Sequence, residues 1–359
     1  MRYRDKELYI CDSKFYQVQL PMNYQENKNQ IKNQLIGFIE RGKGDFDELA
    51  VNILKFQLRY NSTYRRFFEL LGYRENEIKR ASDLPCFPVS FLRGKKVAAF
   101  SFAAEKIFFS SGTTDQIRSE HHIPDLNWYE YISTVSFVKE YGSLQQYNII
   151  GLLPNYMDQK NSSLIHMIKT FMEFSPENIH GLFSSSDSDF FSTLQKALDG
   201  DKKTILIGVS FALLDFAKKV QGDFSADCVI METGGMKGRR KELVREELHS
   251  ILSTAFNTSY IHSEYGMTEL QSQAYSKGKG IYKAGPLMKV FVKEINDCKV
   301  NEKITNSGLV HIIDLANFET IPFVATNDIG TLKDDDSFEI LGRMDGSELR
   351  GCNLMYGNF

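Results

Sequence analysis

Long hydrophobic runs are missing from this sequence, since no stretch approaches the roughly 20 apolar residues that a membrane-spanning helix needs. The first residues, MRYRDKE, are charged and lack the apolar core of a signal peptide. We therefore expect a protein without a membrane span that stays in the cytoplasm.

Cysteine and histidine are few and scattered. The five cysteines, at positions 11, 86, 228, 298 and 352, show no C-x-x-C spacing, which excludes a disulfide framework and a zinc site. Only His121 and His122 are adjacent, and adjacent side chains on a strand or helix point apart. Any metal ion should therefore arrive with a nucleotide.

An excess of positive charge is also missing. The formal net charge of −3 gives no broad basic surface, so we expect no nucleic-acid partner. With 42% hydrophobic and 25% charged residues, the chain has the composition of a globular protein, and its length allows a large core with more than one lobe.

The first part of the chain, residues 1–95, is predicted to be helical. Between residues 25 and 73, apolar residues recur at helical spacing in three stretches, and the NST segment at 61–63 supplies an N-cap for the third. Pro85 and Pro88 then favour an extended connector. The apolar positions are Ile31, Leu35, Phe38, Ile39, Phe46, Leu49, Ala50, Ile53, Tyr64, Phe67, Phe68 and Leu71.

The middle part, residues 96–285, alternates between strand and helix patterns. This alternation predicts an α/β core of β-α-β units with a mostly parallel sheet, whose ligand binds beyond the carboxyl ends of the strands. Predicted strands are 106–110, 148–153, 179–183, 204–209, 228–232 and 259–261, and predicted helices are 126–142, 162–174, 187–198, 212–220 and 241–256.

The last part, residues 286–359, changes to short β-like runs separated by Asn, Asp and Gly. We expect a small β lobe that closes one side of the ligand site. Its predicted strands are 290–294, 309–313, 320–325, 330–333 and 338–341.

A polar loop follows the predicted strand at 106–110. Its hydroxyl groups, free backbone N–H groups and glycine are suited to holding a triphosphate, although it lacks the Walker pattern. Such a cluster alone is equally typical of a simple turn. The loop consists of Ser110, Ser111, Gly112, Thr113 and Thr114.

Four later segments come in a fixed order: ETGG at 232–235, EYGMTE at 264–269, TNDIG at 326–330 and GRMDG at 342–346. Together with the SSGTT loop, this series resembles the adenylate-forming superfamily of acyl-CoA synthetases, luciferase and peptide-synthetase adenylation domains. Because of HSEYGMTEL at 262–270 and a cysteine near the C-terminus, the chain looks most like LuxE-type acyl-protein synthetases over residues 84–352.

This resemblance implies ATP and Mg²⁺ as cofactors and assigns roles at the nucleotide. Thr268 would contact the α-phosphate and Glu269 would ligate Mg²⁺. Tyr265 would face adenine, although a buried core aromatic is the alternative. The remaining nucleotide-binding residues implied are Ser110, Ser111, Gly112, Thr113 and Thr114 for the phosphates, Gly234, Gly235 and Gly266 near the base, and Asp328 and Arg343 for the ribose.

In the resembling families the phosphate loop continues with glycine and ends in lysine, whereas this chain has Asp115 and Arg118 there. Arg118 can supply the missing charge, but Asp115 must point away from phosphate. His262 is a candidate for orienting the acyl carboxylate or a structural histidine, and His121 and His122 either contact nucleotide or are exposed loop residues. Candidates for the acyl-binding wall are Leu152, Leu153, Tyr156 and residues 162–164.

The fold implied is that of the N-terminal part of adenylate-forming enzymes, without the usual C-terminal domain of ~100 residues. Only fourteen residues follow Asp345. Acyl-protein synthetases share this truncation and receive the acyl group on a cysteine near the C-terminus, which matches Cys352; a buried, inert cysteine is the alternative.

The implied function is ATP-dependent activation of a carboxylic acid, usually a fatty acid, as acyl-AMP. The acyl group would then pass to Cys352 and onward to a partner protein, a reductase or a carrier protein. One alternative is a ligase that delivers acyl groups to a carrier protein or CoA. The other is a non-catalytic binding subunit with a nucleotide-binding fold.

Overall fold

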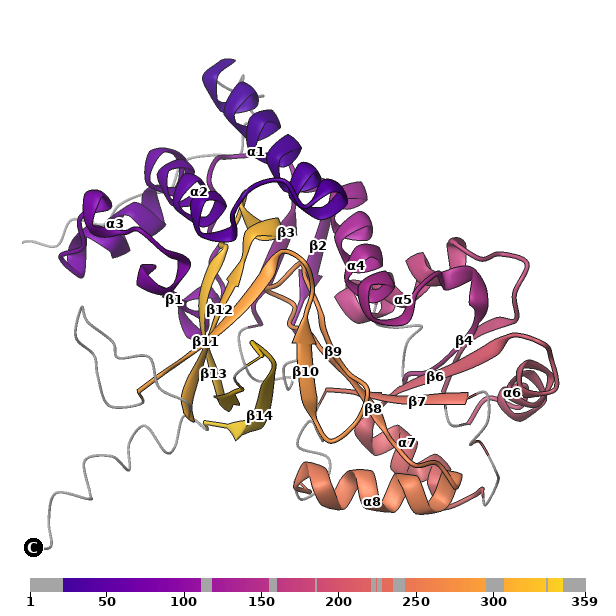
Figure 1. Cartoon of the computed structure of the whole chain (residues 1–359). Helices are drawn as coiled ribbons and strands as arrows, with labels where there is room; N and C mark the ends of the chain where they lie inside the picture. The colour runs from indigo at the N-terminus through magenta and orange to yellow at the C-terminus, as the bar shows by residue number, and fades with distance from the viewer. Residues whose placement is uncertain are drawn as a thin grey trace, which may run out of the picture.

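A computed structural model describes residues 22–110, 118–154, 160–184, 186–220, 224, 228–234, 243–294, 307–333 and 335–344. The elements run from indigo at the N-terminal side to yellow at the C-terminal side in Figure 1. No helix in these ranges is long and apolar enough to cross a membrane.

Three helices begin the described chain, as predicted: α1 (Met22–Arg41), α2 (Phe46–Tyr60) and α3 (Ser62–Leu70). The Asn61 side chain accepts from the Tyr64 N–H at 3.0 Å, which confirms the predicted N-cap of α3. The predicted apolar stripes are packed, and Leu35, Ala50 and Tyr64 are fully buried.

The middle of the chain forms a parallel sheet in the order β5-β4-β6-β7-β8, with helices on both faces. In Figure 1, α4 and α5 lie above these strands, and α7 and α8 lie below them. The bounds are α4 (Leu126–Tyr141), β4 (Tyr147–Leu152), α5 (Ser163–Glu173), β5 (His180–Phe183), α6 (Phe190–Leu198), β6 (Lys203–Val209), α7 (Ser210–Ala217), β7 (Cys228–Thr233), α8 (Arg245–Phe256) and β8 (His262–Tyr265).

The strand predicted at 259–261 is wrong by about three residues. The strand here is β8, whose His262 pairs with Met231 of β7. Tyr260 remains exposed, whereas Ser263 and Glu264 are buried in the sheet. The apolar pattern of 259–261 was misleading because the polar residues that follow it find hydrogen-bond partners inside the protein.

Antiparallel strands extend the sheet in the order β8-β9-β10-β14-β13-β12-β11, and β1 pairs with β13. The sequence did not predict β9 or β10, and it predicted two strands at 320–325 and 330–333 where one long strand runs. The bounds are β1 (Phe87–Pro88), β9 (Ala274–Ser276), β10 (Ile281–Ala284), β11 (Met288–Lys293), β12 (Ser307–Asp314), β13 (Phe323–Leu332) and β14 (Phe338–Arg343).

The predicted strand at 106–110 exists as β2 (Lys106–Phe109), but it does not belong to the parallel sheet. It pairs antiparallel with β3 (Glu120–Ile123) in a separate two-stranded sheet. The phosphate loop therefore connects the two strands of a hairpin, and the expectation of a β-α-β unit at this point is wrong.

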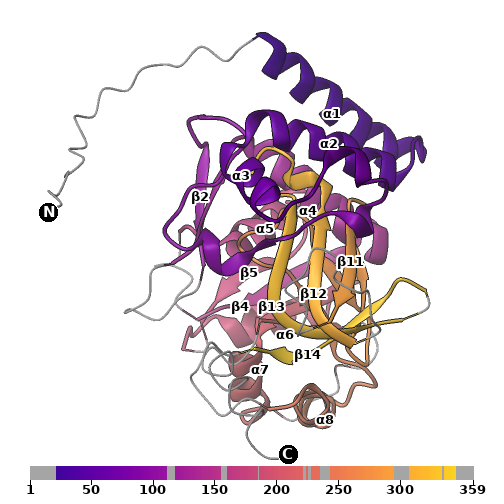
Figure 2. The ribbon, with the colours of Figure 1, turned by 90° about the vertical axis from the view of Figure 1, so that its left-hand side faces the viewer.

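Two apolar cores hold the molecule together. The first joins α1, α2 and α3 to β11, β12 and β13, which lie beneath these helices in Figure 2. The second lies within the parallel sheet and its helices. Because β9 and β10 join the sheet segments of the two cores, side chains at this junction can come from both parts of the chain. The division of the chain into three domains, 1–95, 96–285 and 286–359, stays a prediction.

Candidate active site

Residues from three of the sequence motifs meet between β8, β13 and β14. The Tyr265 hydroxyl donates to Asp328 Oδ2 at 2.7 Å. Asp328 is the register partner of Arg343, whose Nε lies 3.8 Å from Asp328 Oδ1. Burial raises the pKa of Asp328, while the Tyr265 hydroxyl and Arg343 act in the opposite direction. A phenol, a carboxylate and a guanidinium therefore lie together, and their predicted roles at adenine and ribose stay predictions.

The ring of Tyr265 is half-buried and packs by edge contacts. Its centroid lies 5.8 Å from that of Tyr282 and 5.8 Å from that of Phe338. These contacts and the bond to Asp328 fix the orientation of the ring. Tyr265 therefore packs against two aromatic rings, and binding of a base on its face stays a prediction.

Glu269 lies at the end of the same motif and is 7% exposed. Burial raises the pKa of its carboxyl group, whereas a hydrogen bond from Ser119 and the charges of Arg343 and Arg93 lower it. Two guanidinium groups therefore act on this carboxylate, and one of them, Arg343, also acts on Asp328.

A buried histidine contacts the backbone carbonyl group of Thr268. His121 Nδ1 lies 2.7 Å from the Thr268 carbonyl oxygen, and Nε2 lies 3.0 Å from Asn317 Oδ1. Burial lowers the pKa of His121 to about 4. Both partners are acceptors, so the neutral ring, which carries one proton, can donate to only one of them. The predicted exposed position of His121 is therefore wrong, and its contact with nucleotide stays a prediction; neighbouring His122 contacts Glu120 at 3.0 Å on the same strand.

The two ends of the phosphate loop are fixed to each other. The Ser110 N–H donates to the Ser119 carbonyl oxygen at 3.0 Å, and the Ser119 N–H donates to Ser110 Oγ at 2.9 Å. Arg118 is exposed. Since Ser119 also bonds Glu269, the hairpin ends beside the motif that carries Thr268 and Glu269. The predicted loop residues Ser111, Gly112, Thr113, Thr114 and Asp115 lie outside the described residues.

Two predicted glycines lie at the ends of neighbouring strands. Gly234 follows β7 with a φ of +65°, and its carbonyl oxygen accepts from Ser210 Oγ at 2.7 Å. Gly266 follows β8, and a Cβ there would lie 2.5 Å from Glu264 Oε1. Gly235 lies outside the described residues.

Two buried carboxylic acids, Glu232 and Glu264, lie on these same strands. Burial opposes ionisation of Glu232, but a hydrogen bond from His249 and the charge of Arg245 outweigh it and lower its pKa. Burial raises the pKa of Glu264 to about 7; the hydrogen bond from Thr233 opposes this shift and Glu232 adds to it. No sequence pattern distinguishes these two acids.

His262 lies at the far end of β8 from Tyr265, and the described residues of the predicted acyl-binding wall lie on β4 and α5 and beside them. His262 begins β8, at the opposite end from Tyr265, and its Nδ1 lies 3.0 Å from the Tyr141 hydroxyl. Burial lowers the pKa of His262 to about 4. Leu152 and Leu153 are buried in the second core, and Ser162 caps α5. Tyr156 and Cys352 lie outside the described residues.

Sequence reasoning missed Ser119, Asn317, Arg93 and Gln273. Each belongs to no recognised motif; Ser119, Asn317 and Arg93 reach the site from distant parts of the sequence, whereas Gln273 lies seven residues from Gly266. Asn317 shows why, because its side-chain amide donates to the Glu269 carbonyl oxygen at 2.8 Å from 48 positions away. A buried Asn in an otherwise apolar stretch, LANF at 315–318, was the one available signal.

The described residues contain no group of three or more His, Cys, Asp or Glu side chains that could hold a metal ion. Glu269 alone still fits Mg²⁺, which is usually bound by one or two carboxylates together with substrate phosphates and water. A bound divalent cation would favour the ionised form of this buried carboxyl group.

No family model matches the sequence, and no curated protein matches it. Solved structures do match. 2-Hydroxyisobutyryl-CoA ligase in the postadenylation state, in complex with R3-HIB-AMP, is 12% identical with a TM-score of 0.60, over 83% of this chain and 68% of that chain. The open conformation of that ligase, with 2-HIB-AMP and CoA, is 12% identical with a TM-score of 0.55, over 84% and 70%.

ATP-bound MatB from Rhodopseudomonas palustris is 16% identical with a TM-score of 0.48, over 70% of this chain. The chain spans about half the length, 49%, of this and the other first matching structures. The likeness to 2-hydroxyisobutyryl-CoA ligase shows that this chain has the fold of adenylate-forming ligases, which confirms the predicted fold class.

Proposed function

We propose that this protein activates a carboxylic acid with ATP. A carboxylate oxygen of the acid attacks the α-phosphorus, the bond from that phosphorus to the bridging oxygen breaks, and pyrophosphate leaves. The observation that carries the proposal is the contact of Tyr265, Asp328 and Arg343, with Arg343 also acting on Glu269, in a chain with this fold. Three adenylation motifs thereby supply one site.

The nucleoside end of the site is built from Asp328 and Tyr265. Asp328 Oδ2 already accepts from Tyr265, whereas Oδ1 lies 3.8 Å from Arg343, which is too long for a hydrogen bond. Oδ1 can therefore accept from a ribose hydroxyl. The exposed side chain of Arg343 lies beside it and can approach the same sugar or a phosphate.

The phosphate end combines hydroxyl groups and positive charge. The Thr268 hydroxyl makes only a 3.5 Å contact with the Phe109 carbonyl oxygen, so it is free to donate to the α-phosphate. Arg93, Arg118, Arg343 and the SSGTT loop supply further donors. Mg²⁺, when bound through Glu269, neutralises phosphate charge.

We further propose, from the family resemblance, that Cys352 takes the acyl group. Its thiolate attacks the acyl carbonyl carbon, a thioester forms and AMP leaves; a partner protein then receives the acyl group. An acid–CoA or acid–carrier ligase is the second candidate, and the fold match to a ligase crystallised with CoA supports it. A non-catalytic binding subunit is the third.

The test is exchange of labelled pyrophosphate into ATP in the presence of carboxylic acids. We expect acid-dependent exchange, and we expect Glu269→Gln to lower it by ~10²-fold or more, the usual effect of losing one preorganised electrostatic contact. Glu339→Gln is the control. It removes a partly exposed carboxylate on β14 that forms an ion pair with Lys333.

Measurable ATP binding without exchange for any acid would favour the binding-subunit function. Normal exchange in Glu269→Gln would show that Glu269 is not the metal ligand.

A further inference from the structure

One face of β8 and β9 carries polar groups beside the proposed site. Glu264 pairs in register with Tyr275 of β9, and Gly266 lies two residues further on the same side of β8. Gln273, just before β9, lies against this glycine, since its Cγ would be 3.6 Å from a Cβ at Gly266. We call Glu264, Gly266 and Gln273 the acceptor face.

The acceptor face presents a carboxylate and an amide oxygen, and the amide oxygen is buried without a donor. Glu264 Oε2 accepts from the Thr233 hydroxyl, whereas Oε1 lies 2.5 Å from where a Cβ of Gly266 would be. Gln273 is 4% exposed; its Nε2 donates to the Gln271 carbonyl oxygen at 3.2 Å, and its Oε1 is buried without a hydrogen-bond partner. A buried acceptor without a donor costs stability unless a ligand satisfies it.

The charged groups around the acceptor face also favour a ligand that donates a hydrogen bond or carries positive charge. Arg245 and His249 contact Glu232 at 3.8 and 3.6 Å. Burial raises the pKa of Glu264 to about 7, and the Glu232 carboxylate adds to this shift while the hydrogen bond from Thr233 opposes it. A ligand that donates a hydrogen bond or brings positive charge would compensate this buried acid.

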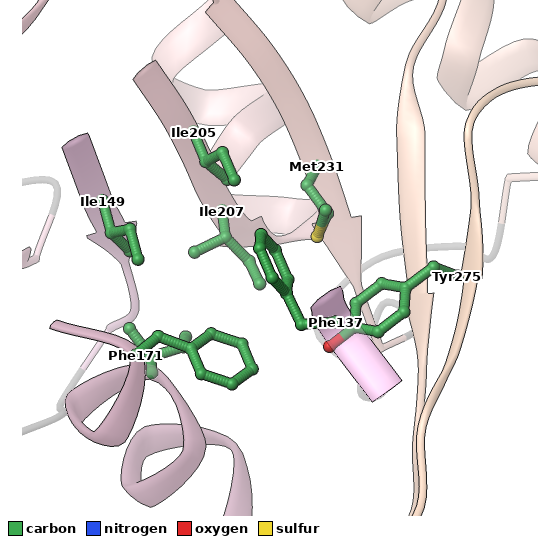
Figure 3. Close-up of a pocket in the computed structure, with 8 residues that line it drawn as sticks. Phe137, Ile149, Phe171, Ile205, Ile207, Met231 and Tyr275 are labelled. Carbon is green, nitrogen blue, oxygen red and sulfur yellow. The ribbon is translucent and has the colours of Figure 1, made fainter. Parts of the chain in front are cut away.

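Behind the acceptor face, the core is closed. Tyr275 also lines an apolar cavity of about 10 Å³, together with Phe137, Phe171, Ile207 and Met231, as Figure 3 shows. This is room for about one water-sized sphere. The rings of Phe137, Phe171 and Tyr275 pack the described core on this side of the sheet.

We propose that the acid activated at this site is short and carries a hydrogen-bond donor, an ammonium or a hydroxyl group, close to its carboxylate, and that Glu264 and Gln273 accept from that donor. Gly266 lets the substrate approach because it has no side chain between the acceptor oxygens and the reacting carboxylate. This inference rests on the proposed acid activation.

The first test compares acids of matched size in pyrophosphate exchange: alanine, lactate and propionate, with tetradecanoate as a long unsubstituted acid. We expect alanine or lactate to exceed propionate in kcat/KM by at least ~10-fold, because a site built to bond a donor rejects the analogue that lacks it. Alanine above lactate would identify the donor as an ammonium group, and the reverse order would identify a hydroxyl group.

Exchange with tetradecanoate or propionate above both substituted acids would overturn this inference and leave acid activation intact. No exchange with any acid would instead overturn the proposed function, so the two failures are distinguishable.

The second test removes the charge of the acceptor. Glu264→Gln keeps the side-chain volume, and we expect it to lower the ratio of kcat/KM between the substituted acid and propionate by at least ~10-fold. Glu319→Gln is a matched control. Glu319 is 4% exposed and Glu264 is 7% exposed, but Glu319 contacts Tyr24 and Lys28 of α1.

An unchanged ratio in Glu264→Gln would overturn the proposal. If that variant does not fold, Gln273→Met removes the second acceptor and should lower the same ratio, and an unchanged ratio there has the same meaning.

Discussion

Glu232 and Glu264 are carboxylic acids on neighbouring strands, and their surroundings shift their pKa values in opposite directions. Burial opposes ionisation of both acids, but Arg245 and a hydrogen bond from His249 lower the pKa of Glu232. Burial raises the pKa of Glu264 to about 7, with Glu232 adding to the shift and the Thr233 hydroxyl opposing it. Identical buried side chains therefore differ in pKa because their partners differ.

This difference makes folding stability depend on pH at one residue. Between pH 4.5 and 7, folded Glu264 keeps its proton while the unfolded chain loses it, so the stability of the folded state falls as pH rises. Glu264→Gln removes this loss. We expect the Tm difference, variant minus parent, to increase by about 2–5 °C from pH 5 to pH 8 in thermal unfolding.

The buried histidines do not disturb this comparison, since they titrate alike in both proteins and cancel in the difference. A Tm difference that is constant between pH 5 and pH 8 would show that Glu264 is already ionised at pH 5.

Single residues were predictable from sequence only where a motif marks them. Tyr265 and Arg343, which two motifs mark, both contact Asp328 of a third. Ser119 and Asn317 were missed because their role comes from position in space, although an Asn in the apolar stretch 315–318 was a signal. His121 was misassigned since a polar residue near a loop resembles an exposed one, whereas here it is 4% exposed.

At the scale of elements, a short turn fixes the segment that carries Thr268 and Glu269. Asp314 Oδ2 accepts from the N–H groups of Gln271 and Ser272 at 2.8 and 3.0 Å. The Asn317 amide, at the end of the 3₁₀ turn Leu315–Asn317, donates to the Glu269 carbonyl oxygen. The turn therefore satisfies backbone groups that no strand partner reaches.

Asn317→Ala should destabilise the protein by about 2–4 kcal/mol, because it leaves the carbonyl oxygens of Glu269 and Ile321 without their donor and removes the acceptor beside His121. Urea unfolding measures this cost. Asn178→Ala is the control, since its amide also donates to two carbonyl oxygens, of Gln145 and Tyr147, but nearer the surface.

We expect the control to cost about 1 kcal/mol or less. Equal costs at the two positions would show that the turn does not fix this segment.

Elements with strong periodicity were predicted well, and those determined by pairing were not. Helices α4 to α8 begin and end within a few residues of their predicted bounds. By contrast, Asn327 and Asp328 suggested a turn between two strands, yet they lie within the single strand β13 because β12 and β14 pair with it on both sides. Such pairing joins distant segments and leaves no local pattern.

At the scale of the molecule, covalent geometry limits how far Cys352 can be from the site. Strand β14 ends at Arg343, nine residues earlier, so the two Cα atoms are at most about 30 Å apart. Cys352→Ser should therefore keep pyrophosphate exchange but lose hydroxylamine-sensitive acyl label on the protein. Label retained at the parent level would reject Cys352 as acceptor and favour transfer to CoA or a carrier protein.

The first core contains both Tyr24 and Phe338, and this has a consequence during synthesis on the ribosome. The apolar faces of α1, α2 and α3 emerge early, but the strands that cover them are made last. At about 5–20 residues per second, roughly 10–50 s pass between the synthesis of these helices and that of the strands that cover them. The parallel sheet and its helices, complete by β8, can fold during that interval, whereas the nascent helices depend on chaperones or on each other.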